Sequence, residues 1–182
     1  AAASIRDNPN HCEVGAAQYA SAGAKSSIMD SLDVAVLGAT EIDTSFNINV
    51  HTDSNGSIMG GSGGHSDAAA GSKLALIAAP LFRGRLPIVR DCVTCISTPG
   101  QDVDVLVTQA GVAVNPKNTE LRERLRAAGL PVVDIHELKE RAERITGVPA
   151  PLPVSDRVVA RVISRDGELL DTIRQTDNRS GI

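Results

Sequence analysis

The stretch "LDVAVLGATEID", residues 32–43, decides the fold class. An unbroken aliphatic run that ends at a glycine is typical of a strand buried on both faces, as in a parallel sheet. Similar aliphatic segments recur along the chain at intervals that leave room for connecting helices. We therefore expect strands near residues 33–38, 75–79, 103–108 and 131–133.

Two amphipathic segments between and after these strands predict helices near 119–128 and 136–146. The first has Asn118 or Thr119 as its N-cap, a solvent face of mixed charge and Gly129 at its end. Strands that alternate with helices indicate an α/β fold, here an open, mostly parallel sheet flanked by helices.

The tail of the chain has a different period. Two alternating runs flank Asp166-Gly167 and predict a C-terminal β-hairpin over residues 157–174. Alternation also predicts a short strand at "FNINV", 46–50, and the β-branched residues of "LPIVRDCVTCI", 86–96, predict a further, extended strand. The second segment holds a CxxC pair, Cys92 and Cys95, and an extended CxxC favours reduced structural thiols over a zinc or redox site.

Composition excludes several function classes. The 182 residues carry a net charge of −4, a pI near 5.5 and 2% aromatic residues, which argues against nucleic-acid binding. No apolar run reaches the length of a bilayer span, and the four histidines lack metal-ligand spacing, so we expect no membrane segment and no metal. Reduced thiols without a signal peptide predict a cytoplasmic protein.

The stretch "IMGGSGGHSD", residues 58–67, places four glycines in five positions. A phosphate-binding P-loop needs Lys and then Ser or Thr after the last glycine, and "HSD" stands there instead. The dinucleotide spacing G-x-G-x-x-G is also missing. A plain surface loop remains one alternative. The other is a ligand loop that leads into a helix capped by Ser66 or Asp67, whose amides would face a thioester oxygen, a carboxylate or a pyrophosphate.

The loop and its continuation, "GGSGGHSDAAAGSKLALIAAPLFRGRLPIV", resemble the alpha subunit of citrate lyase, a citrate CoA-transferase. The segments "LDVAVLGATEIDTSFNINV" and "TPGQDVDVLVTQAGVAVNP" are similar to the same family, and the similarity runs from about residue 7 to about residue 176. More distantly, the chain resembles the second half of the family I CoA-transferases.

The resemblance implies a reaction in which a carrier protein bearing an acetyl thioester exchanges acetate for citrate. The substrate is then an acyl-CoA or phosphopantetheine-type thioester, and no cofactor is bound permanently. The implied partners are the beta subunit (citryl lyase) and the gamma subunit (acyl carrier protein) of an oligomeric complex. The Glu-Asn-Gly motif of the family I nucleophile is missing here. "AAASIRDNPN" also looks like the end of a helix, so we expect residues 1–182 to form one CoA-transferase-like domain from the C-terminal half of a longer two-domain subunit, inactive alone.

The resemblance also assigns candidate site residues. Gly61, Gly63 and Gly64 match the loop that supplies an oxyanion donor, and Glu41 lies where the family has Gln or Glu beside the substrate. Glu13, on an expected strand, is a second candidate nucleophile. The candidates for substrate or CoA binding are Gly60, Gly61, His65, Asn47, Asn49, Arg83 and Arg85. Each could instead be solvated or bonded within the protein.

Two other functions stay open. The chain could be a non-catalytic module that docks a carrier protein or a lyase subunit, in which case it forms no enzyme thioester with acetyl-CoA. It could also be a nucleotide-binding α/β domain, which titration with NAD or ATP would reveal.

Overall fold

Five strands form the central sheet of the computed structural model, which describes residues 2–20 and 27–177. In sheet order they are β1 (Ala35–Leu37), β4 (Ala75–Ala78), β8 (Val105–Thr108), β9 (Gly111–Val114) and β10 (Val132–Val133). All neighbours pair in parallel except β8 and β9, which a two-residue turn joins as a hairpin. The predicted open, mostly parallel sheet is confirmed.

A smaller sheet packs beside it, with β2 (Glu41–Asp43) between β3 (Ile48–Asn49) and β7 (Val89–Arg90). The short pair β5 (Phe82–Arg83) and β6 (Leu86–Pro87) precedes β7. One core joins the two sheets and a helix: its largest fully buried side chains are Phe46, Ile42, Ile48, Ile77, Leu106 and Leu138. The strand predicted at 46–50 is therefore present, shortened to two residues because Phe46 adopts a φ of 66° in the preceding turn.

The two long helices begin and end within one residue of their predicted bounds. Helix α4 (Thr119–Ala127) starts after Asn118 and contacts β9 and β10. Helix α5 (Ile135–Thr146) is capped by Asp134, whose carboxylate accepts from the His136 amide at 2.8 Å, and it buries Leu138 in the core.

The shorter helical elements are α1 (Ala2–Asp7), α2 (Ala16–Tyr19), α3 (His65–Gly71) and the 3₁₀ turns η1 (Ile28–Ser31) and η2 (Gly100–Asp102). Residues 2–7 are helical, as "AAASIRDNPN" indicates. The predicted cap of α3 is wrong: its N-cap is Gly64, so Ser66 and Asp67 already lie within the first turn. The helix therefore begins at His65, two or three residues earlier than the predicted caps imply.

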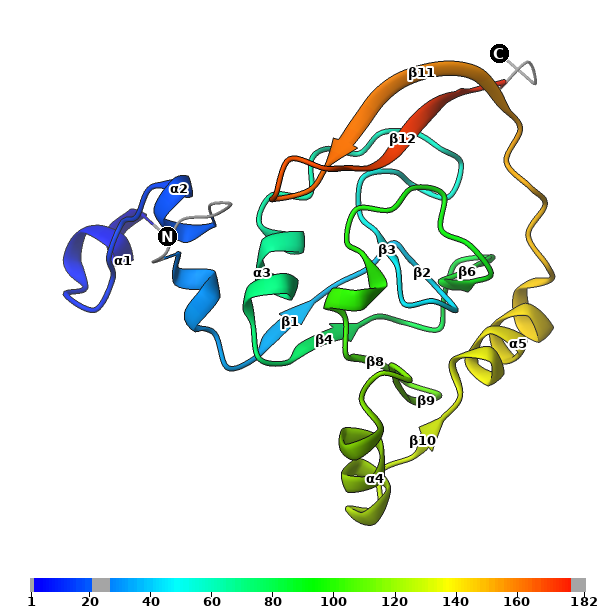
Figure 1. The fold of residues 1–182 in the computed structure, drawn as a ribbon, viewed down its shortest axis with the longest axis horizontal. Helices are drawn as coiled ribbons and strands as arrows, with labels where there is room; N and C mark the ends of the chain where they lie inside the picture. Colours follow the sequence, from blue (N-terminus) through cyan, green and yellow to red (C-terminus); the bar gives the residue numbers. More distant parts are fainter. Residues whose placement is uncertain (1, 21–26, 178–182) are drawn as a thin grey trace.

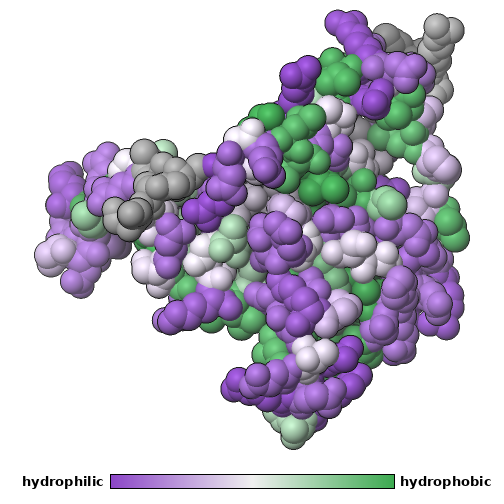
Figure 2. Space-filling model, in the orientation of Figure 1, coloured by the Kyte–Doolittle hydropathy of each residue, from purple (hydrophilic) through white to green (hydrophobic). Residues whose placement is uncertain are grey.

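The C-terminal hairpin is confirmed and longer than predicted, with β11 (Val154–Ile163) paired to β12 (Leu169–Thr176). Val162 and Ile173 pack on buried Cys95, and the Asp171 carboxylate accepts from the Ile96 amide at 2.8 Å. These contacts hold the hairpin over the loop that leads into α3 (Figure 1). Apolar surface gathers over the hairpin in the same view (Figure 2).

Two predictions about local structure are wrong. The strand expected at 86–96 ends at Arg90, and Cys92 and Cys95 lie in an irregular loop because the Thr94 amide bonds to the Glu41 carboxylate instead of a strand. Cys12, Cys92 and Cys95 are all free thiols. Glu13 lies in an irregular, exposed segment and not on a strand. Within the described residues, no helix is both long and apolar enough to cross a membrane.

Candidate active site

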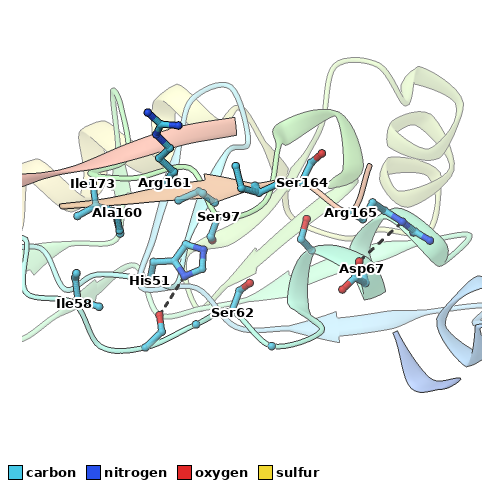
Figure 3. A pocket seen from close by; sticks show the side chains of 16 residues that line it. His51, Ile58, Ser62, Asp67, Ser97, Ala160, Arg161, Ser164, Arg165 and Ile173 are labelled. Carbon is cyan, nitrogen blue, oxygen red and sulfur yellow. Dashed lines mark hydrogen bonds and ion pairs between the residues drawn. The ribbon is translucent and has the colours of Figure 1, made fainter. Parts of the chain in front are cut away.

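A cavity of about 550 Å³, lined by both polar and apolar residues, lies between the glycine loop and the hairpin (Figure 3). The loop contributes Gly60, Gly61, Ser62 and Gly63, and the opposite wall is the segment Ala160–Arg165 of β11 and its turn. His51 and Ser97 lie between these walls. The sequence therefore brings together two segments about 100 positions apart, and the glycine loop faces a cavity as the ligand-loop alternative requires.

The backbone of the loop explains its glycines. Gly60 and Gly63 have φ angles of 152° and 58°, a region that side chains disfavour. A Cβ added at Gly60, Gly61 or Gly63 would meet no atom within 4 Å, so the space in front of the loop is open. Within the described part of the chain, the amides of these glycines donate to no protein acceptor. The loop thus presents bare backbone and uncommitted N–H donors to the cavity.

Gly64, predicted as a second oxyanion donor, faces away from this cavity. A Cβ there would lie 3.1 Å from Met29 Cε and 3.2 Å from Tyr19 Cε1. This glycine is therefore required by close packing against η1 and α2, a reason that the sequence pattern does not reveal.

His51 is held in one orientation at the cavity. Its Nδ1 lies 3.2 Å from the carbonyl oxygen of Gly60, and because a carbonyl only accepts, Nδ1 carries the proton. Its backbone is fixed as well, since its carbonyl accepts from the Met59 amide at 2.8 Å and its amide donates to Asn49 Oδ1 at 3.0 Å. Nε2 has no hydrogen-bond partner among the described residues and turns toward the open space (Figure 3).

Glu41 lies beneath this site, fully buried. Its carboxylate pairs with Arg90 and accepts from the Thr94 amide at 2.7 Å, the Thr94 hydroxyl at 3.1 Å and Asn49 Nδ2 at 3.0 Å. Burial alone would raise the pKa of the Glu41 carboxyl, but these hydrogen bonds and the Arg90 charge outweigh it and hold the pKa below its ordinary value. Both oxygens of this carboxylate are occupied, and Glu41 does not line the cavity. In this geometry Glu41 is a structural anchor, and nothing here supports its predicted catalytic role.

The amides of Asn47 and Asn49 are also committed to the protein. Asn49 is fully buried; it donates to Glu41 and Thr52, and its oxygen accepts from the amides of His51 and Thr52. Asn47 donates to Asp43 Oδ2 at 3.0 Å and accepts from the Gly100 amide at 2.9 Å. Neither side chain lines the cavity.

His65, the first residue of α3, connects two loops. Its Nε2 donates to the Gly38 carbonyl at 2.8 Å, and its Nδ1 lies 2.9 Å from the Thr98 hydroxyl. Burial lowers the pKa of the His65 imidazole, and the Gly38 carbonyl only partly opposes this shift. Both ring nitrogens are used, so in this structure His65 secures the end of the glycine loop to β1 and does not face the cavity.

The predicted arginine clamps lie elsewhere. Arg83 and Arg85 are exposed in the β5–β6 hairpin and do not line the cavity. The arginines at the cavity are Arg161, which extends away from it, and Arg165, which lies 3.1 Å from Asp30 and 3.9 Å from Asp67 (Figure 3). Across the described ranges, no group of three or more His, Cys, Asp and Glu side chains could hold a metal ion.

Sequence reasoning thus found the loop but missed His51 and the hairpin wall. The sequence around His51 matches no functional motif, because a single histidine between a strand and a turn is not a recognisable pattern. The hairpin wall depends on tertiary packing, and only the serines of the loop and of the Ser164 turn hinted at a polar site.

Comparison with known proteins gives consistent matches. The family described as citrate lyase, alpha subunit (CitF), matches residues 1–176. Citrate lyase alpha chains from Klebsiella pneumoniae and Escherichia coli (strain K12) are 53% and 54% identical over 98% and 96% of this chain. A Streptococcus mutans protein described as the alpha subunit of citrate lyase, solved in complex with citrate, superposes with a TM-score of 0.91 at 44% identity over 96% of this chain. The chain spans only 34–35% of the length of these three relatives.

Proposed function

The chain belongs to the citrate lyase alpha subunit family, and from that premise we propose that it forms the substrate pocket of a citrate CoA-transferase. The proposed reaction exchanges acetate for citrate on the acetyl thioester of an acyl carrier protein, giving citryl carrier protein and acetate. The proposed partners are the beta and gamma subunits of the same lyase. The proposed location is the cytoplasm, a setting that suits three unpaired thiols.

The cavity beside the glycine loop carries this proposal. A pantetheine arm is thin, and it can lie against Gly60, Gly61 and Gly63, where no side chain stands in its way. The uncommitted amides of these glycines are suited to the oxygen of a tetrahedral intermediate, and such donors are among the largest contributors to acyl-transfer rates. The serine hydroxyls and His51 around the cavity suit a carboxylate substrate.

The nucleophile is proposed to lie outside this chain. No glutamate lines the cavity among the described residues, and the buried Glu41 is fully occupied. This observation also favours the second candidate, a docking module without catalysis of its own.

The test compares the complete alpha subunit with the isolated 182-residue chain. Both are incubated with acetyl-CoA, and citrate-dependent acetate release and hydroxylamine-sensitive enzyme thioester are measured. We expect release and thioester only with the complete subunit. A complete subunit without citrate-dependent release would contradict the transferase, and full turnover by the 182-residue chain would contradict the external nucleophile.

A further inference from the structure

We propose that His51 binds a carboxylate of the acid substrate through Nε2 and takes up a proton as it does so. The proposal deepens the function proposed above and rests on it. Nothing in the sequence singles out this residue; its role follows from how the fold holds the imidazole at the cavity.

The ring is pre-oriented by contacts that leave one nitrogen available. Nδ1 donates to the Gly60 carbonyl, so rotation of the ring would break that hydrogen bond. Nε2 is then the atom that faces the cavity. Because only Nδ1 is committed, the neutral ring offers Nε2 as an acceptor, and protonation adds a donor without disturbing the Gly60 contact.

A buried network supports this orientation from below. Arg90 and Thr94 hold the Glu41 carboxylate, which accepts from Asn49, and Asn49 accepts from the His51 amide. Since Glu41 and Asn49 are fully buried, the position of the His51 backbone is fixed by the core. Two residues that the sequence suggested as catalytic or substrate-binding thereby act on the site through His51.

The charges near His51 are compatible with an added negative charge at Nε2. The charged groups that line the cavity with His51 are Asp67 of α3 and Arg161 and Arg165 of the hairpin. His65 is close enough to interact electrostatically with His51, Glu41 of β2 lies in the network below it, and Asp53 lies in the turn that follows it. Glu41 is neutralised by Arg90, and Asp67 faces Arg165. Asp53 accepts from the amides of its own turn.

A substrate carboxylate at Nε2 would add a negative charge directly beside the ring. An adjacent negative charge favours the protonated imidazole. Binding of the acid is then coupled to proton uptake, and a hydrogen bond between two charged groups forms.

The experiment is calorimetric titration of citrate into the complete alpha subunit, with residues numbered as here. Repetition in buffers of different ionisation enthalpy gives the number of protons taken up per citrate. We compare the wild type with His51→Gln and with the control His136→Gln, at an exposed histidine outside the cavity. The difference between variants cancels any protons carried by citrate itself.

We expect His51→Gln to weaken citrate binding about ten- to hundredfold, the range for loss of a hydrogen bond between charged groups. We also expect it to lose the proton uptake that accompanies citrate binding, with His136→Gln matching the wild type. If His51→Gln melts early, His51→Asn carries the same test. A variant that keeps both citrate affinity and proton uptake overturns the role of His51 alone. A wild-type subunit that binds no citrate overturns the proposed function together with it.

Discussion

Gly61 offers a direct test of why the loop is bare. Its φ is not positive and a Cβ there would meet nothing within 4 Å, so Gly61→Val creates no left-handed backbone strain and its Cβ enters open space. We expect the free energy of unfolding to change by no more than about 0.5 kcal/mol, as for other substitutions without such features. The valine would nevertheless occupy the cavity where the thioester is proposed to lie. A displacement of the acyl group by about 1 Å costs about 10²-fold in rate.

Gly56→Ala is the matched control. Its φ is 84°, and its Cβ would come within 2.4 Å of Thr176 Cγ2 and 2.7 Å of Leu152 Cδ2. The left-handed backbone costs about 1–2 kcal/mol and the overpacking about 1–3 kcal/mol, so this change should lower the free energy of unfolding. Gly56 does not line the cavity beside the glycine loop, so turnover should be kept.

The assays are citrate-dependent acetate release and urea unfolding of the complete subunit for both variants. We expect Gly61→Val to lose turnover and keep stability, and Gly56→Ala to do the reverse. If Gly61→Val folds normally and turns over at the wild-type rate, the loop is only a turn. Gly64→Val is a poor probe, because that position packs on Met29 and Tyr19.

Further predictions concern three residues, Glu41, His65 and Cys95. Glu41→Gln should cost about 3–5 kcal/mol in urea unfolding, because Arg90 would lose its partner in a buried site. In the wild type, the depressed pKa of Glu41 stabilises the folded protein at pH values above about 4.5, the ordinary pKa of this group. A pH series should show this stability lost as the pH falls below that value, and Glu41→Gln should not show the decline. The lowered pKa of His65 means that the unfolded chain protonates first, so stability should fall as the pH drops below about 6.5; His65→Gln should flatten that segment, and an unchanged slope would refute the assignment. Burial raises the pKa of Cys95 to about 12, so a thiol reagent at pH 8 should modify Cys12 and Cys92 in the native protein and reach Cys95 only after unfolding.

The sheet and its helices were predictable because their signals are local. The run 32–37 does contain a parallel strand, β1, and Asp134 caps α5 through a contact two residues away. The predicted burial of that strand on both faces is wrong, because β1 lies at the edge of the sheet and leaves Val36 66% exposed. The misassigned strand at 86–96 shows the limit of such signals. Its β-branched residues are typical of a strand, but Thr94 bonds to Glu41, which lies 53 positions earlier.

The candidate site was predictable only where backbone chemistry marks it. The glycines at 60–63 signal a need for bare backbone, and they do line a cavity. The polar candidates could not be sorted from the sequence, because the partners that occupy them come from distant segments. Asn47 meets Gly100, and His65 meets Thr98 and Gly38. His51 escaped notice for the same reason, since its orientation depends on a loop carbonyl nine residues away.

In the proposed function, acid exchange takes place in the cavity between the glycine loop and β11. The most direct test is a crystal structure of the complete subunit grown with citrate. We expect citrate density in this cavity, in contact with Gly61 and within hydrogen-bond distance of His51 Nε2. Density only in another hollow of the surface, such as the groove that α4 forms with Lys73 and Asp104, would contradict it.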